Sequence, residues 1–149
     1  MNTTHTEYTV YYDGSCQLCS AEMRNLMLRN TEGRVEFVDA AAPGFDAAAL
    51  GVTQQALMNA LHLRRHTDGQ WLIAVPAFEA LYRTLGLPGV AAALRQPLLA
   101  RLAGRAYPWL VRNRHRLPRA PITWLFERAG RRAAERAAAR RCSQNGCAL

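Results

Sequence analysis

The stretch that decides the fold of this chain is residues 8–19, YTVYYDGSCQLC. Its first half is a run of β-branched and aromatic residues, which predicts a buried strand over residues 7–12. The pair Asp13-Gly14 is typical of a sharp turn, because both residue types readily adopt the backbone angles that turns require. Two cysteines follow the turn. The stretch is therefore predicted to lead from a strand, through a tight loop, to a pair of thiols.

A helix is expected directly after this turn, from Ser15 to about Arg29. Ser15 is a predicted N-cap, and apolar side chains then recur at helical spacing on one face. Gly33 is the predicted end of the segment, since glycine commonly stops a helix. Cys16 would then lie in the first turn of the helix. Cys19 would lie one turn further in, where we expect it to be the more buried thiol.

The following segments predict a mixed α/β domain. The expected elements are a strand over 35–39, a helix over 53–61 capped by Thr53, strands over 62–66 and 70–74 around an Asp-Gly turn, and a helix from Pro76 to Leu85. The strand, helix and strand at the start predict a right-handed parallel crossover, and the later strands predict an antiparallel hairpin. This order is that of a thioredoxin-like α/β fold, with a parallel strand pair plus an antiparallel hairpin flanked by helices.

From residue 90 onward the pattern is helical. We predict core contacts for Trp109 and for two apolar stripes, Leu99, Leu102, Ala103, Ala106 and Leu110 in the first and Ile122, Leu125, Phe126, Ala129 and Ala133 in the second. Pro108 is expected to kink the first helix. The expected divisions are a thioredoxin-like redox core over 1–89, an Arg-rich helical extension packed on it over 90–141, and a mobile tail with two cysteines over 142–149.

Charge is unevenly distributed along the chain. Its 149 residues carry a net charge of +8, and the basic residues other than histidine are all arginine. Residues 1–94 contain six Arg against nine acidic residues, whereas residues 95–149 contain thirteen Arg against two Glu. A basic half permits an acidic partner, but a solvated helical surface is the simpler interpretation.

The sequence shows no signal for a membrane span or for export. No apolar run approaches the roughly 18–20 residues that cross a bilayer. The start of the chain has neither the basic residues nor the apolar core of a secretory signal. We therefore expect a cytoplasmic protein without a membrane partner. In that compartment a Cys-x-x-Cys motif indicates redox or metal chemistry rather than a structural disulfide.

Cys16 and Cys19 have the spacing of a dithiol that exchanges disulfides. The attacking species is a thiolate, and a free thiol with a pKa of about 8.5 is only slightly ionised at neutral pH. Backbone N–H groups and the helix dipole favour an anion at a first helical turn. We therefore predict that Cys16 attacks a substrate disulfide and that Cys19 resolves the mixed disulfide. Asp13 has two interpretations: it forms the turn with Gly14, or it accepts the Cys19 proton during resolution.

Residues 12–19 resemble the signature of the DCC family of thiol–disulfide oxidoreductases, small thioredoxin-like proteins named for an Asp-x-x-Cys-x-x-Cys motif. The resemblance covers roughly residues 8–119 and continues in Leu61-His62-Leu63 with Asp68-Gly69, in Ala77-Phe78, and in Tyr107 with residues 111–116. It implies a thioredoxin-like fold and protein-disulfide oxidoreductase activity at Cys16 and Cys19. The implied partners are a protein or low-molecular-weight disulfide and an undefined electron donor, with no cofactor. The oligomeric state is left open.

The sequence departs from the family in two places. Ala74 and Pro76 stand where the family usually has a Gly and a small or acidic residue before Ala-Phe. Residues 52–61 also contain no proline, whereas thioredoxins carry a cis-proline that faces the dithiol from that region. The way in which thioredoxins dock their substrates therefore does not transfer to this chain.

Two other classes of function stay open at this point. A metal site is one, because Cys16, Cys19, Cys142 and Cys147 make up a candidate four-thiolate zinc set. Cys142 and Cys147 are alternatively a second dithiol that passes electrons to the first, or incidental thiols on a frayed end. A nucleic-acid-binding module is the other class, with candidate phosphate contacts at Arg112, Arg114, Arg116 and Arg119, near Trp109 and His115. The strand–turn–helix setting of Cys16 and Cys19 favours redox use.

Overall fold

A four-stranded mixed sheet lies at the centre of the fold. The structure is a computed structural model, and it describes residues 5–117 and, after these, only residues 120, 121, 124, 128, 131, 132, 135, 136 and 139. The strands are β1 (Tyr8–Tyr12), β2 (Val35–Asp39), β3 (His62–Arg65) and β4 (Trp71–Ile73), in the spatial order β2-β1-β3-β4. β1 and β2 are parallel, whereas β3 is antiparallel to both of its neighbours.

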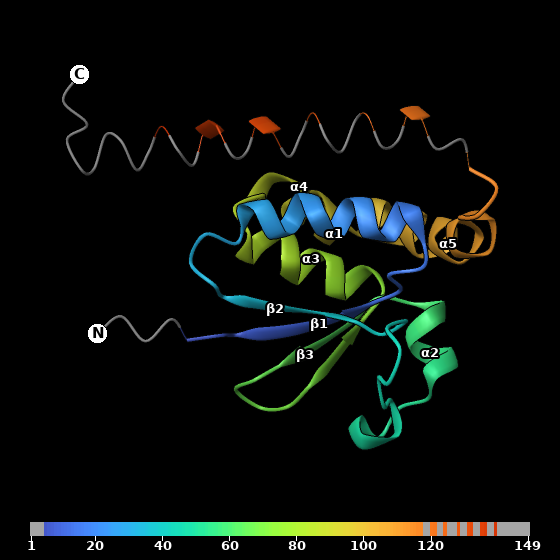
Figure 1. The fold of residues 1–149 in the computed structure, drawn as a ribbon. Helices are drawn as coiled ribbons and strands as arrows, with labels where there is room; N and C mark the ends of the chain where they lie inside the picture. Colours follow the sequence, from blue (N-terminus) through green and yellow to red (C-terminus); the bar gives the residue numbers. More distant parts are fainter. Residues whose placement is uncertain are drawn as a thin grey trace.

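Helices cover both faces of this sheet. They are α1 (Gln17–Arg29), α2 (Gln54–Asn59), α3 (Val75–Thr84), α4 (Pro88–Arg95) and α5 (Pro97–Asn113), with a 3₁₀ turn at Ala48–Leu50. Figure 1 shows α1, α3 and α4 on one side of the sheet and α2 toward the other. The predicted thioredoxin-like α/β fold with a helical C-terminal extension is confirmed. Within the part of the chain described, none of the helices is both long and apolar enough to span a bilayer.

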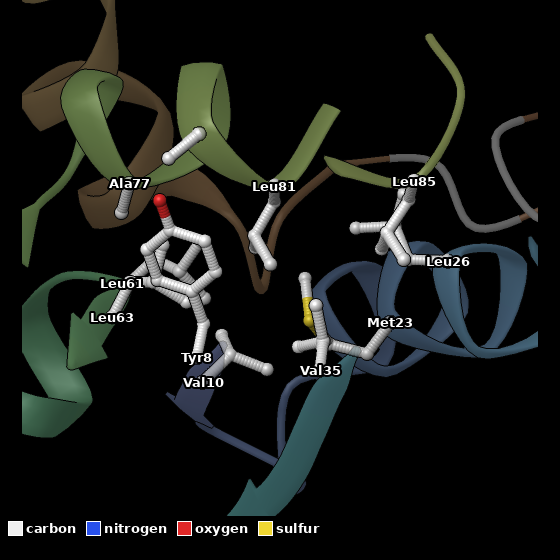
Figure 2. Close-up of a cluster of buried hydrophobic side chains, with 11 residues drawn as sticks. Tyr8, Val10, Met23, Leu26, Val35, Leu61, Leu63, Ala77, Leu81 and Leu85 are labelled. Carbon is white, nitrogen blue, oxygen red and sulfur yellow. The ribbon is translucent and has the colours of Figure 1, made fainter. Parts of the chain in front are cut away.

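The pleat of β1 divides the core into two layers. Tyr8 and Val10 point to the side of α1 and α3, and Tyr11 points to the opposite side, where it packs near Leu57. In Figure 2, Met23 of α1 and Leu81 of α3 point toward each other in the layer that Tyr8 and Val10 of β1 also enter. Burying an aliphatic side chain of this size contributes roughly 1.5–3 kcal/mol. This larger layer fixes α1 against the sheet, and with it the cysteines at the start of the helix.

The parallel register brings two loops together at one edge of the sheet. Tyr8 pairs with Val35 and Tyr12 with Asp39, so β1 and β2 end side by side. The turn after β1 therefore lies next to the carboxylate that ends β2. This edge is where Asp13 and the two cysteines are placed.

Local predictions at the ends of α1 were partly wrong. Cys16, not Ser15, is the N-cap, and the Cys16 sulfur accepts a hydrogen bond from the Cys19 N–H. Ser15 does not cap the helix because its hydroxyl donates to Asp13 Oδ1 instead. At the other end, α1 stops at Arg29 with Asn30 as C-cap, and Gly33 lies in the following turn with a φ of 64°.

The predicted burial of the first apolar stripe is wrong. Leu99, Leu102 and Leu110 on α5 are 44%, 54% and 37% exposed, and Trp109 is 55% exposed. The inner face of α5 instead carries Tyr107, whose hydroxyl accepts a hydrogen bond from the Leu61 N–H at 2.8 Å. α5 continues through Pro108 as one helix. The second stripe (Ile122, Leu125, Phe126, Ala129 and Ala133) lies outside the described residues.

Candidate dithiol site

The turn between β1 and α1 is held by two carboxylates. Asp13 Oδ1 accepts hydrogen bonds from the Ser15 N–H, at 3.0 Å, and from the Ser15 hydroxyl. Asp39 Oδ1 accepts from the Gly14 N–H at 2.9 Å. A Cβ on residue 14 would overlap the Asp39 carboxylate, so the close approach of these two loops requires glycine. The turn is therefore fixed on both sides before the cysteines begin.

The two thiols lie within direct reach of each other. The Cys19 Sγ–H donates to Cys16 Sγ at a sulfur–sulfur distance of 2.8 Å, and the Cys19 N–H donates to the same sulfur at 3.4 Å. Both cysteines are free thiols. Cys16 has no exposed surface and Cys19 is half-buried, which is the reverse of the burial that the sequence predicted. The capping position explains this, since the Cys16 side chain folds back over the helix start.

The geometry makes the two thiols chemically unequal. Hydrogen bonds from the Cys19 side chain and backbone lower the pKa of Cys16 to about 6, although burial opposes them. The pKa of Cys19 is raised, first because its thiol donates to Cys16, then by burial and by the negative charge of the neighbouring sulfur. The lower pKa predicted for Cys16 is thus present in the structure, while its greater exposure is not.

An ion pair from the far end of α5 completes the site. Arg114 contacts Asp13 Oδ2 at 2.7 Å, and both side chains are largely buried. The Arg114 charge lowers the pKa of Cys16 and of Cys19, and the Asp13 charge raises both. Sequence reasoning placed Arg114 among candidate phosphate contacts and missed this role. The available clue was its position in the segment after Tyr107, where the sequence resembles the DCC family.

A cavity of about 180 Å³ opens beside Cys19, and we refer to it as the Cys19 pocket. Side chains from α1, α2, α3 and α5 line it, and nearly all of its surface is apolar. Its wall also includes Glu22, whose carboxylate is buried and accepts a hydrogen bond from the Tyr82 hydroxyl at 2.7 Å. Burial raises the pKa of Tyr82, and the Glu22 charge raises it further. Cys19 thus faces a compact, mostly apolar space.

The structure brings together only part of the predicted residues. Asp13, Cys16 and Cys19 meet at one site, whereas Cys142 and Cys147 lie outside the described residues, as does Arg119. Among the residues that are described, no group of three or more His, Cys, Asp or Glu side chains is arranged to hold a metal ion. The four-thiolate zinc set and the tail relay therefore stay predictions.

The candidate phosphate contacts among the described residues differ in their surroundings. Arg114 is committed to Asp13, while Arg112 and Arg116 are exposed. Trp109, interpreted from the sequence as a core residue, is exposed instead. Two of the four histidines lie in or beside β3, where a ring nitrogen of His62 bonds to the Ala60 carbonyl and one of His66 bonds to the Thr9 hydroxyl.

Comparison with known proteins agrees with this site. A family model described as DCC1-like thiol-disulfide oxidoreductase matches residues 10–120, a range that holds the end of β1, the dithiol and Arg114. The chain belongs to this family. An uncharacterized, chloroplastic protein of Arabidopsis thaliana is 32% identical to the DCC1-like chain over 98 residues, which are 64% of this chain and 45% of the relative. The chain thus spans less than half the length of that relative. No solved structure matches the DCC1-like chain.

Proposed function

We propose that this chain is a protein-disulfide oxidoreductase in which Cys16 attacks and Cys19 resolves. The observation that carries the proposal is the difference between two thiols 2.8 Å apart, one with its pKa lowered to about 6 and the other with its pKa raised. At neutral pH Cys16 is then mostly thiolate, the form that attacks disulfides, and Cys19 keeps its proton.

The same contacts explain how the two steps follow each other. The Cys16 thiolate forms a bond to one substrate sulfur, and the second substrate sulfur leaves as a thiolate that takes a proton from solvent. Cys16 then no longer carries the negative charge that raises the pKa of Cys19. Cys19 loses its proton to solvent and attacks the Cys16 sulfur, and the first substrate sulfur leaves as a thiolate that takes a proton from solvent. Two electrons pass to the substrate, and an external dithiol donor reduces the resulting Cys16–Cys19 disulfide.

Asp13 fits a positioning role in this proposal better than that of a proton acceptor. One of its carboxylate oxygens accepts two hydrogen bonds from Ser15, and the other contacts Arg114. Both carboxylate oxygens are thus engaged with partners other than Cys19. Asp13 therefore holds the turn and the Arg114 charge beside the thiols.

Access to Cys16 requires local movement. Cys16 has no exposed surface in the reduced protein, and the thiol that lines the Cys19 pocket is that of Cys19. We therefore expect the Cys19 side chain or the turn before it to shift when a substrate disulfide binds. Protein disulfides and low-molecular-weight disulfides are both candidate substrates, and a reducing, cytoplasmic setting stays a prediction.

Trapping of the mixed disulfide tests the proposal. The experiment uses a background with Cys142 and Cys147 replaced by Ser, so that only the dithiol reacts. Cys19→Ser retains a donor to Cys16 and should accumulate a mixed disulfide with a disulfide-bonded peptide, seen by mass spectrometry. Cys16→Ser should not accumulate it. Accumulation on Cys19 alone would reverse the assigned roles, and the absence of any mixed disulfide in both variants would reject the function.

A further inference from the structure

We propose that the Cys19 pocket is a specificity pocket for one apolar side chain that neighbours the disulfide in a peptide or protein substrate. The inference rests on the proposed thiol–disulfide exchange and adds a substrate class to it. It concerns which disulfides the site prefers, and the following features of the pocket support it.

The wall of the pocket is built for an apolar group. Met23 of α1, Phe78 of α3 and Val111 of α5 face the space, and Leu57 closes it from α2. An apolar surface that water covers in the free protein favours an apolar ligand, by roughly 25 cal/mol for each Å² removed from water. The pocket is also lined from four separate helices, so its shape depends on the packed fold and not on one loop.

The charged side chains in the wall, and the Tyr82 hydroxyl, already have partners within the protein. The Tyr82 hydroxyl donates to Glu22 Oε1, and Glu22 Oε2 accepts from the Asn25 side chain at 3.4 Å. Arg114 is paired with Asp13. A charged substrate group that entered would lose its water without gaining a partner from these groups, which is costly. The buried Glu22 carboxylate would in addition repel an acidic group.

The volume of the pocket limits its occupant to one group. An apolar cavity of about 150 Å³ is known to accept a benzene-sized molecule. At about 180 Å³, the Cys19 pocket has room for a phenylalanine or leucine side chain and not for a folded segment. A single side chain is therefore the occupant that the space fits.

The position of the pocket connects it to the chemistry. Cys19 forms part of its wall, and the Cys16 sulfur lies 2.8 Å from the Cys19 sulfur. A substrate cysteine joined to Cys16 is thus held at the edge of the pocket. The next residue of that substrate is about 3.8 Å along its chain, so its side chain is the group that reaches the pocket.

A set of matched peptides tests the inference. Three disulfide-bonded peptides differ only in the residue beside the cysteine, which is Phe, Ser or Glu, and kcat/KM for their reduction is measured. We expect the Phe peptide to exceed the Ser peptide at least about tenfold, with the Glu peptide lowest. Val111→Phe fills the pocket and should bring the ratio of Phe to Ser close to one. Ala60→Leu is a second filling variant, and Ala106→Phe, exposed on the same helix, is the control that keeps the ratio.

The outcomes separate this inference from the function on which it rests. Equal turnover of all three peptides by the wild-type protein would overturn the pocket and leave thiol exchange in place. A ratio that both filling variants preserve, with melting temperatures unchanged, would also overturn it. Loss of all turnover in the wild type, together with no mixed disulfide at Cys16, would instead remove the proposed function itself.

Discussion

The charges on Asp13 and Arg114 act against each other on the same two sulfurs. Asp13 raises the pKa of both thiols and Arg114 lowers it, while the two side chains contact each other at 2.7 Å. The carboxylate that forms the turn would by itself disfavour the Cys16 thiolate. The guanidinium offsets that effect, so a turn built on Asp13 remains compatible with an acidic thiol.

Separate replacement of the two charges should shift the Cys16 pKa in opposite directions. We expect Arg114→Gln to raise it by about one pH unit, because the uncompensated Asp13 charge then acts on a largely buried thiolate. Asp13→Asn should lower it, and the double variant should lie close to the wild type. Thiolate absorbance across pH 4–10, in a background without Cys142 and Cys147, measures the effect. Arg112→Gln is the control, since Arg112 is exposed on α5. A Cys16 pKa that Arg114→Gln leaves unchanged would contradict the role assigned to the ion pair.

Site residues could be predicted from the sequence only where their contacts are local. Cys16, Cys19 and Asp13 lie within one turn and one helix start, and their proximity follows from spacing alone. Arg114 and Asp39 reach the same place from distant segments. Their contacts with Asp13 and Gly14 depend on how α5 and β2 pack, which no local pattern records.

The connection from β4 to α3 carries an unusual backbone. Ala74 has a φ of 60° and a ψ of −124°, a conformation that residues with a Cβ rarely adopt. Its N–H donates to the Leu61 carbonyl and its carbonyl accepts from the Phe78 N–H, so both ends of the residue are held. Glycine is the residue expected here from the resemblance to the DCC family, and the positive φ gives the physical reason.

Ala74→Gly should therefore stabilise the protein. Relief of the strained backbone is worth roughly 1–3 kcal/mol, and the added freedom of glycine in the unfolded chain removes about 0.4–1 kcal/mol of that gain. We expect a net rise of about 1 kcal/mol in the free energy of unfolding, measured by urea denaturation. The matched control is Ala106→Gly in the exposed part of α5, where the same exchange should cost about 1 kcal/mol. A loss of stability in Ala74→Gly would show that its backbone is not strained.

Secondary structure was more predictable than the orientation of α5. Turn and cap residues around 67–69 and at Thr53 act locally, and the hairpin and α2 form as expected. The rotation of α5 was not predictable in this way. Tyr107, Val111 and Arg114 lie on one face at helical spacing, and the bonds of Tyr107 to Leu61 and of Arg114 to Asp13 hold that face inward. The more apolar leucine stripe is consequently left exposed.

At the scale of the whole molecule, the dithiol site exists only when distant segments are assembled. β1 leads into the turn, and the start of α1 carries the thiols. Arg114, directly after α5, carries the charge that balances Asp13. Ionisation of Cys16 is favoured by these contacts and is not favoured in the unfolded chain. The proton equilibrium of one thiol is therefore coupled to folding.

The reduced protein should accordingly gain stability with rising pH relative to a Cys16→Ser variant. The folded pKa of Cys16 is about 6, whereas an unfolded thiol titrates near 8.5. Between these values the unfolded state binds more protons, so stability rises with pH and is lost as pH falls through about 6. The contribution of Cys19 to stability has the opposite sign, because its raised pKa keeps it protonated in the folded state. This contribution destabilises the folded state only above the ordinary thiol range of pH.

The difference in unfolding free energy between the two proteins should then grow from pH 5.5 to 8.5, by up to ~1.4 kcal/mol per pH unit. Urea denaturation of both proteins under reducing, anaerobic conditions measures it. Subtraction cancels the titratable groups that they share, apart from Cys19, whose raised pKa depends on Cys16 and affects stability only above the ordinary thiol range. A difference that stays flat across this range would mean that folding does not lower the pKa of Cys16. This result depends on the folded environment of the thiol and not on any substrate. It would therefore count against the lowered pKa of Cys16 even if the protein still reduced disulfides.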